Sequence, residues 1–83
     1  MEGAQKAYAN VLFEDNVKLV YFKWNIWKNS VRRDRREDLL QHLLMAFWNA
    51  CNAYDPTRGA TFRTYVDACL RNAYFAFVKK KTA

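Results

Sequence analysis

The sequence predicts an all-α fold, a compact bundle of about four helices. Apolar residues recur at spacings of three and four in four separate segments, the period of a helix with one buried face. The only proline, Pro56, and the second of two glycines, Gly59, fall together in one short turn. Hydrophobic residues make up 52% of the 83-residue chain, enough for a small dense core. We therefore expect a single helical domain over residues 1–83.

The first two helices are expected over residues 3–13 and 16–28. The first has one apolar stripe, formed by Ala4, Ala7, Tyr8, Val11 and Leu12. Between the two segments, Asp15 or Asn16 is placed to cap the second helix, because short polar side chains accept hydrogen bonds from the free amides of a helix start. The second helix has two apolar stripes, which predicts a helix packed on both sides. These stripes are Val17, Val20, Tyr21, Trp24 and Trp27, and Leu19, Phe22 and Ile26.

A polar, basic connection follows over residues 29–36, with four arginines in five positions. Such a cluster could grip phosphates, but we favour a solvated loop. Asp34 and Glu37 have the spacing of a capping box, so a third helix is expected over residues 35–53. Its polar positions fall on one narrow arc that is almost free of charge, whereas a face in solvent usually carries Lys, Glu and Arg. This arc indicates a docking surface or, as the alternative, an uncharged solvent face; its residues are Asp38, Gln41, His42, Met45, Asn49 and Asn52.

The stretch Asp-Pro-Thr-Arg-Gly over residues 55–59 predicts a compact turn, because proline fixes its own φ and glycine accepts a positive φ. Thr61 is placed to cap a fourth helix over residues 62–79. One side of that helix is expected to face the core: Phe62, Val66, Cys69, Leu70, Ala73, Ala76 and Phe77.

The opposite side of the fourth helix mixes cations, an amide, a hydroxyl and aromatic rings. Cations hold phosphates, amides read base edges, and rings stack on unpaired bases, so this face suits single-stranded nucleic acid. Alternatively, the rings lie at the edge of the core and the cations are solvated. The candidate nucleic-acid-binding residues are Arg63, Thr64, Tyr65, Ala68, Arg71, Asn72, Phe75 and Lys79, with Lys80 and Lys81 extending the positive track.

Composition narrows the function further. A formal charge of +6 favours polyanionic partners. Cys51 and Cys69 lie at helical apolar positions and are expected to be reduced core residues, as in a cytoplasmic protein. We find no signal-peptide pattern and no membrane span. With no catalytic triad, metal-ligand spacing or glycine-rich phosphate loop, we expect no enzyme activity, no metal and no cofactor.

Several segments, in this order and spacing, resemble conserved region 2 of bacterial sigma factors, and the resemblance runs over about residues 16–81. They are residues 16–20 (Asn-Val-Lys-Leu-Val), 38–41 (Asp-Leu-Leu-Gln), 54–59 (Tyr-Asp-Pro-Thr-Arg-Gly), 62–65 (Phe-Arg-Thr-Tyr) and 70–72 (Leu-Arg-Asn). The last two fit the pattern of the small alternative, extracytoplasmic-function-type branch. The paired tryptophans of the housekeeping branch are absent, since their positions hold Ala68 and Cys69.

The resemblance implies two partners. The third helix would contact the clamp helices of the largest subunit of RNA polymerase core, through Asp38, Gln41, His42, Met45 and Asn49. The fourth would recognise the minus-ten promoter element and capture a flipped base of its non-template strand. His42 stands where the family usually has an acidic residue, which predicts a weakened, altered or pH-sensitive contact. An anti-sigma regulator is a further partner that the resemblance admits.

Two alternatives stay open. The chain can be a fragment of a longer sigma factor, or a short stand-alone protein, for example from a phage or mobile element, that occupies the polymerase and redirects or inhibits it. It can also be a basic helical module that binds nucleic acid nonspecifically and never touches polymerase. In that last case the uncharged arc of the third helix would be dispensable.

Overall fold

The computed structural model describes the backbone of residues 2–82 and the side chains of residues 8–79. Within this range the chain forms four α-helices and no strand, which confirms the all-α prediction. The α-helices are α1 (Glu2–Asn16), α2 (Lys18–Trp27), α3 (Arg36–Ala53) and α4 (Phe62–Thr82). Three single 3-10 turns join them: η1 (Lys28–Ser30), η2 (Arg33–Arg35) and η3 (Pro56–Arg58).

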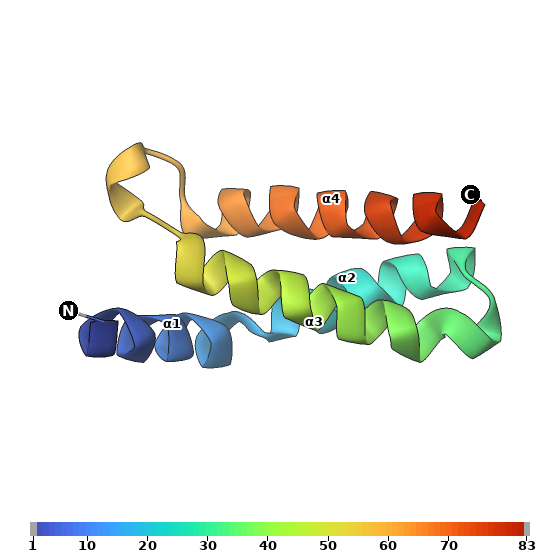
Figure 1. Cartoon of the computed structure of the whole chain (residues 1–83), viewed down its shortest axis with the longest axis horizontal. Helices are drawn as coiled ribbons and strands as arrows, with labels where there is room; N and C mark the ends of the chain where they lie inside the picture. The colour runs from blue at the N-terminus through green and yellow to red at the C-terminus, as the bar shows by residue number, and fades with distance from the viewer. Residues whose placement is uncertain (1, 83) are drawn as a thin grey trace.

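The helix α3 lies in the middle of the bundle (Figure 1). It packs against α1, α2 and α4. The chain runs through α1 and α2 in one general direction, returns through α3, and reverses again into α4 (Figure 1). The resulting body is elongated, with principal extents of 41 × 21 × 20 Å. Because α3 touches every other helix, its apolar residues hold the bundle together.

The core is built mainly from α3 and α4. Its largest fully buried side chains are Phe47, Leu39, Leu43, Leu70, Val20 and Val66. Ring contacts tie the helices together: Phe13 of α1 lies 5.2 Å from Phe47, and Phe62 of α4 lies 6.2 Å from it, measured between ring centroids. On the core side of α4 the prediction was wrong for Ala76, which is exposed. The side chains of Ala4 and Ala7 lie outside the described residues.

The junction of α1 and α2 differs from the prediction. Neither Asp15 nor Asn16 caps α2, which begins after Val17 without a side-chain cap. Val17 has helical φ and ψ, and its carbonyl accepts a hydrogen bond from the amide of Val20 at 3.0 Å. Asn16 still belongs to α1, so its side-chain amide donates back to the Leu12 carbonyl at 2.9 Å. The backbone here turns without the extended residue that a side-chain cap requires.

Only Leu19 of the second apolar stripe of α2 packs against the core, and the other two residues are not buried against another helix. Phe22 is 57% exposed and Ile26 is 54% exposed, so the prediction that α2 packs on both sides was wrong. Most of the first stripe does face the core, through fully buried Val20 and through Trp24 and Trp27. Tyr21 of the same stripe is exposed. With α3 in the centre and α2 at the side of the bundle, α2 has neighbours on one side only.

The basic connection before α3 is more ordered than the solvated loop that we favoured. The Arg36 side chain donates to the Lys28 carbonyl at 3.1 Å, and the Trp24 indole donates to the Arg36 carbonyl at 2.7 Å. The predicted capping box is wrong, because α3 starts without a side-chain cap. Backbone carbonyls of the preceding turn take that role: the Arg35 amide donates to the Arg32 carbonyl, and the Arg36 amide donates to the Arg33 carbonyl.

The turn between α3 and α4 forms as predicted. The Asp55 carboxylate accepts from the Thr57 amide at 2.9 Å and from its hydroxyl at 2.6 Å, and these bonds lower the pKa of Asp55, with Arg58 contributing. Gly59 has φ +88°. The Thr64 amide donates to the Thr61 hydroxyl at 3.2 Å, which confirms Thr61 as the cap of α4. Side-chain hydrogen bonds and the left-handed Gly59 therefore fix the turn that sets the direction of α4.

Substituting Gly59→Ala should lower the free energy of unfolding by about 1 kcal/mol, because a Cβ is disfavoured at a positive φ. No atom lies within 4 Å of that added Cβ, so the loss comes from backbone strain alone. Urea denaturation measures it. Gly59→Asn is the matched control, since asparagine tolerates the left-handed region, and it should recover most of the loss. Equal losses in both variants would contradict this explanation.

Candidate functional site

The uncharged arc of α3 is on the surface. Asp38, Gln41, Met45 and Asn49 are exposed, and Met45 is 71% exposed. His42 is half-buried at the edge of the arc. The structure gathers four of these five residues, all but Asn49, around a shallow pocket of about 320 Å³, which Arg35 and Phe77 complete. An exposed methionine surrounded by short polar groups is a surface suited to a protein partner.

Contacts with α4 position the edge of this arc. The His42 ring lies 5.6 Å from the Phe77 ring, centroid to centroid. The Arg35 guanidinium sits over the same Phe77 ring at 4.9 Å, and its Nε lies 3.5 Å from the Asp38 carboxylate. Phe77 itself is buried. A core residue of α4 thus orders His42, Arg35 and, through Arg35, Asp38 before any partner arrives.

The outer face of α4 is exposed as predicted. Seven of its candidate nucleic-acid-binding residues are exposed: Arg63, Thr64, Ala68, Arg71, Asn72, Phe75 and Lys79. Tyr65 is half-buried at the margin of the face. The Thr61 hydroxyl donates to the Thr64 hydroxyl at 2.9 Å, which leaves the Thr64 proton free to be donated outward. The side chains of Lys80 and Lys81 lie outside the described residues.

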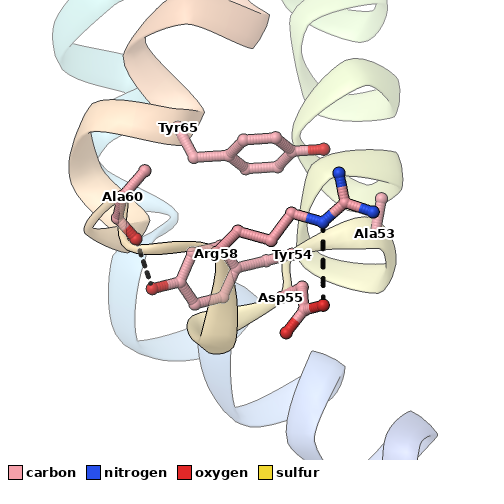
Figure 2. Close-up of a pocket in the computed structure, with 6 residues that line it drawn as sticks. All are labelled: Ala53, Tyr54, Asp55, Arg58, Ala60 and Tyr65. Carbon is pink, nitrogen blue, oxygen red and sulfur yellow. Dashed lines mark hydrogen bonds and ion pairs between the residues drawn. The ribbon is translucent and has the colours of Figure 1, made fainter.

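A pocket that the sequence did not predict opens beside the start of α4. Figure 2 shows the Arg58 side chain extending between the Tyr65 ring and Asp55. The pocket has a volume of about 310 Å³. Tyr54 closes one side, because its hydroxyl donates to the Ala60 carbonyl at 2.9 Å, and the Arg58 guanidinium lies 3.8 Å from the Asp55 carboxylate (Figure 2). The sequence predicted only a compact turn here. Arg58, with Tyr54 and Tyr65 on either side of it in the sequence, was the signal that could have indicated this pocket.

The Tyr65 hydroxyl in this pocket stays protonated, so its ring is neutral. Burial raises the pKa of Tyr65, neighbouring Cys69 raises it further, and Arg58 offsets part of the rise. Because the ordinary phenol pKa is already about 10, Tyr65 carries no charge at neutral pH. A neutral ring beside an arginine can stack on a base without repelling the phosphates of the same strand. Tyr65 also lies 5.8 Å from Tyr54, so the two rings form one aromatic wall.

The cysteines belong to the interior. Cys51 is buried, and burial raises the pKa of its thiol to about 11, so it stays protonated at neutral pH. Cys69 is half-buried beside Tyr65. Among the described residues, no three His, Cys, Asp or Glu side chains come together as a metal site. No helix in the described part of the chain has both the length and the apolar character needed to span a membrane.

The described chain is an all-α bundle that presents an exposed, nearly uncharged arc on α3 and an exposed face with cations and aromatic rings on α4. A family comparison identifies it more closely: the model of Sigma-70 region 2 matches residues 12–83, so the chain belongs to the Sigma-70 region 2 family. This membership supports a role in transcription initiation, with RNA polymerase and promoter DNA as partners, and the family is not one of enzymes. The curated proteins and the solved structures gave no significant match.

Proposed function

We propose that the chain is a sigma-factor-like initiation module that uses α3 to bind RNA polymerase core and α4 to hold the opened minus-ten element. The match to Sigma-70 region 2 over residues 12–83 carries this proposal. On the polymerase side, Asp38, Gln41, His42, Met45 and Asn49 contact the clamp helices of the largest subunit. The exposure of Met45 supports this role, since apolar surface near the centre of an interface contributes most of the binding energy.

On the DNA side, the outer face of α4 follows the non-template strand. Arg63, Arg71 and Lys79 lie near its phosphates, and Asn72 is available to base edges. The pocket beside Tyr65 takes a flipped base, with the aromatic wall stacking on it and Arg58 holding the adjacent phosphate. The volume of about 310 Å³ and the position of Arg58 beside the Tyr65 ring in Figure 2 support this assignment. The motifs at residues 62–65 and 71–72 favour the small alternative branch of the family.

A pull-down of bacterial RNA polymerase core tests the polymerase contact. The wild-type chain should retain core enzyme, and the double variant Gln41→Ala/Asn49→Ala should retain at least tenfold less, which is the effect of losing about 1.4 kcal/mol of binding free energy. Because both side chains are exposed, the thermal midpoint and the affinity for free DNA should stay nearly unchanged. If both proteins retain the same amount of core enzyme, α3 is not the docking helix.

Tyr65→Ala should weaken binding to single-stranded non-template DNA by about 5- to 100-fold, because base stacking on an aromatic ring contributes about 1–3 kcal/mol. Binding to duplex DNA should fall much less, since paired bases do not expose their faces. Fluorescence anisotropy with matched single-stranded and duplex probes measures both. Tyr65→Phe keeps the ring and is the control; it should bind like wild type. Equal losses on the two probes would exclude stacking.

One observation favours a second role on the same surfaces. Ala68 and Cys69 stand where the housekeeping branch has the two tryptophans that prop open the duplex, and Ala68 is exposed on the α4 face. A domain that docks on polymerase but opens DNA weakly would occupy the enzyme and redirect or inhibit it. An open-complex assay with permanganate separates the roles: promoter opening supports the initiation module, whereas retention without opening supports the occupying role.

A further inference from the structure

A third pocket lies where α4 faces α2. Its volume is about 420 Å³, within the range of about 300–1,000 Å³ that is usual for small-ligand pockets. Two residues of α2 and four of α4 line it: Lys23, Trp27, Asp67, Arg71, Tyr74 and Phe75. It shares no residue with the pocket beside Tyr65 or with the arc on α3.

The aromatic wall of this pocket is held in place by its own contacts. The Trp27 and Tyr74 rings stack at 4.6 Å between centroids, with 13° between their planes. The Ser30 hydroxyl donates its only proton to the Trp27 carbonyl, so the Tyr74 hydroxyl donates to Ser30. Phe75 lies 5.7 Å from Tyr74 and is 56% exposed. The wall therefore offers one ordered, exposed ring to a flat ligand.

A carboxylate in the same pocket has an ion-pair partner but no hydrogen-bond partner among the described residues. The Asp67 Oδ1 atom is shielded from solvent and accepts no hydrogen bond from any described residue. The nearest cation, Lys23 Nζ, lies 3.9 Å away, which is beyond hydrogen-bonding distance. The Asp67 side chain as a whole is 38% exposed, and its carboxylate accepts no hydrogen bond from the described residues. A ligand that brings an N–H group to the exposed side of this carboxylate would therefore gain a charge-assisted hydrogen bond.

Two cations, Lys23 and Arg71, line the pocket beside the Phe75 ring and the Asp67 carboxylate. Lys23 is directed toward Trp27, with Nζ 5.8 Å from the ring centroid. Arg71 is exposed, and it forms no hydrogen bond or ion pair with the described residues. A guanidinium with five free donors fits a phosphate. The pocket thus combines a stacking surface, a hydrogen-bond acceptor and a phosphate-binding cation.

We propose that the pocket between α2 and α4 binds a nucleotide whose base carries an exocyclic amino group. The base stacks on Phe75, its amino group donates to the Asp67 carboxylate, and its phosphate lies against Arg71 and Lys23. Cytosine fits this arrangement, whereas uracil and thymine present a carbonyl oxygen at the same ring position and would leave two acceptors facing each other. The nucleotide can be free or part of a DNA strand that extends past the outer face of α4.

The proposal shares Arg71 and Phe75 with the α4 face that is proposed above to bind DNA, but it does not depend on polymerase binding. Its test contains no polymerase, so failure of one proposal leaves the other standing. The full 83-residue chain is titrated by calorimetry with cytidine monophosphate and with uridine monophosphate. These probes have the same sugar and phosphate and differ at the group that meets Asp67. The cytidine compound should bind about tenfold more tightly, the preference expected for a charge-assisted hydrogen bond.

Asp67→Asn is the decisive variant. Its amide can donate as well as accept, so the ratio of the two affinities should fall close to one. The matched control is Asp15→Asn, which changes an exposed carboxylate on α1 far from the pocket lining and should preserve the tenfold preference. Thermal melting confirms that both variants are folded. Arg71→Ala should weaken both nucleotides equally, because it removes only the phosphate contact.

Oligonucleotides distinguish the two sources of the nucleotide. Labelled oligo-dC and oligo-dT of equal length are titrated with the wild type and with Asp67→Asn, and fluorescence anisotropy gives the affinity for each. A preference for dC that Asp67→Asn abolishes, without binding of the free monophosphates, assigns the pocket to a base in a DNA strand. Selective binding of free cytidine monophosphate assigns it to a free nucleotide. Absence of any preference that depends on Asp67, in both experiments, overturns the proposal.

Discussion

Phe47→Ala is expected to lower the free energy of unfolding by about 3–5 kcal/mol, the usual loss when a buried phenylalanine is truncated. Phe47 is fully buried in α3, and its ring contacts Phe13 of α1 and Phe62 of α4. Its removal would leave a cavity where three helices meet. A small domain is often stable by only 5–15 kcal/mol, so this loss takes a large part of the total.

Urea denaturation followed by circular dichroism measures this loss. Met45→Ala is the control on the same helix, since Met45 is mostly exposed and its truncation should change stability by about 0.5 kcal/mol or less. If Phe47→Ala unfolds at nearly the wild-type urea concentration, the three helices do not depend on this contact. The packing of α1 against α3 would then rest on other contacts, such as buried Ala9 and the ring of Trp48, which lies 5.7 Å from Phe13.

The second large effect is expected at the polymerase surface. Met45→Glu should weaken binding to RNA polymerase core by about a hundredfold or more. Truncating a central interface residue commonly costs about 2 kcal/mol, and a charge buried without a partner adds to that cost. In the free domain Met45 is 71% exposed, so the same glutamate remains in water and stability stays near that of the wild type. A binding titration with purified core enzyme measures the loss.

Phe75→Glu is the matched control, because it places the same charge on an exposed apolar position of α4. We expect it to reduce affinity for DNA through repulsion of the phosphates and to leave polymerase binding intact. Met45→Glu should show the reverse pattern. If both variants lose polymerase binding equally, the docking surface extends over α4 and is not confined to the arc on α3.

Much of the fold follows from local sequence signals. The helical period of apolar residues predicted the buried positions Val66, Leu70, Ala73 and Phe77 of α4. The corner around Pro56 and Gly59, with Thr61 as a cap, also formed as predicted. These features depend on residues that lie within one or two helical turns of each other in the sequence, so local spacing is enough to predict them. The exposure of the α3 arc and of the outer face of α4 follows from the same periodicity.

Other features depend on which helix lies next to which. The stripe with Phe22 and Ile26 has the pattern of a core face but stays exposed, because α3 takes the central position and leaves that side of α2 without a neighbour. The expected caps at Asn16 and Asp34 are absent, since backbone carbonyls already satisfy those helix starts.

The two pockets that we propose to bind nucleotides also depend on how the helices pack. Arg58 meets Tyr65 only when the corner folds back, and Lys23 meets Asp67 only when α2 packs beside α4. Periodicity assigns each residue to a face of its own helix. The distance between faces of different helices depends on long-range packing, which local spacing does not encode.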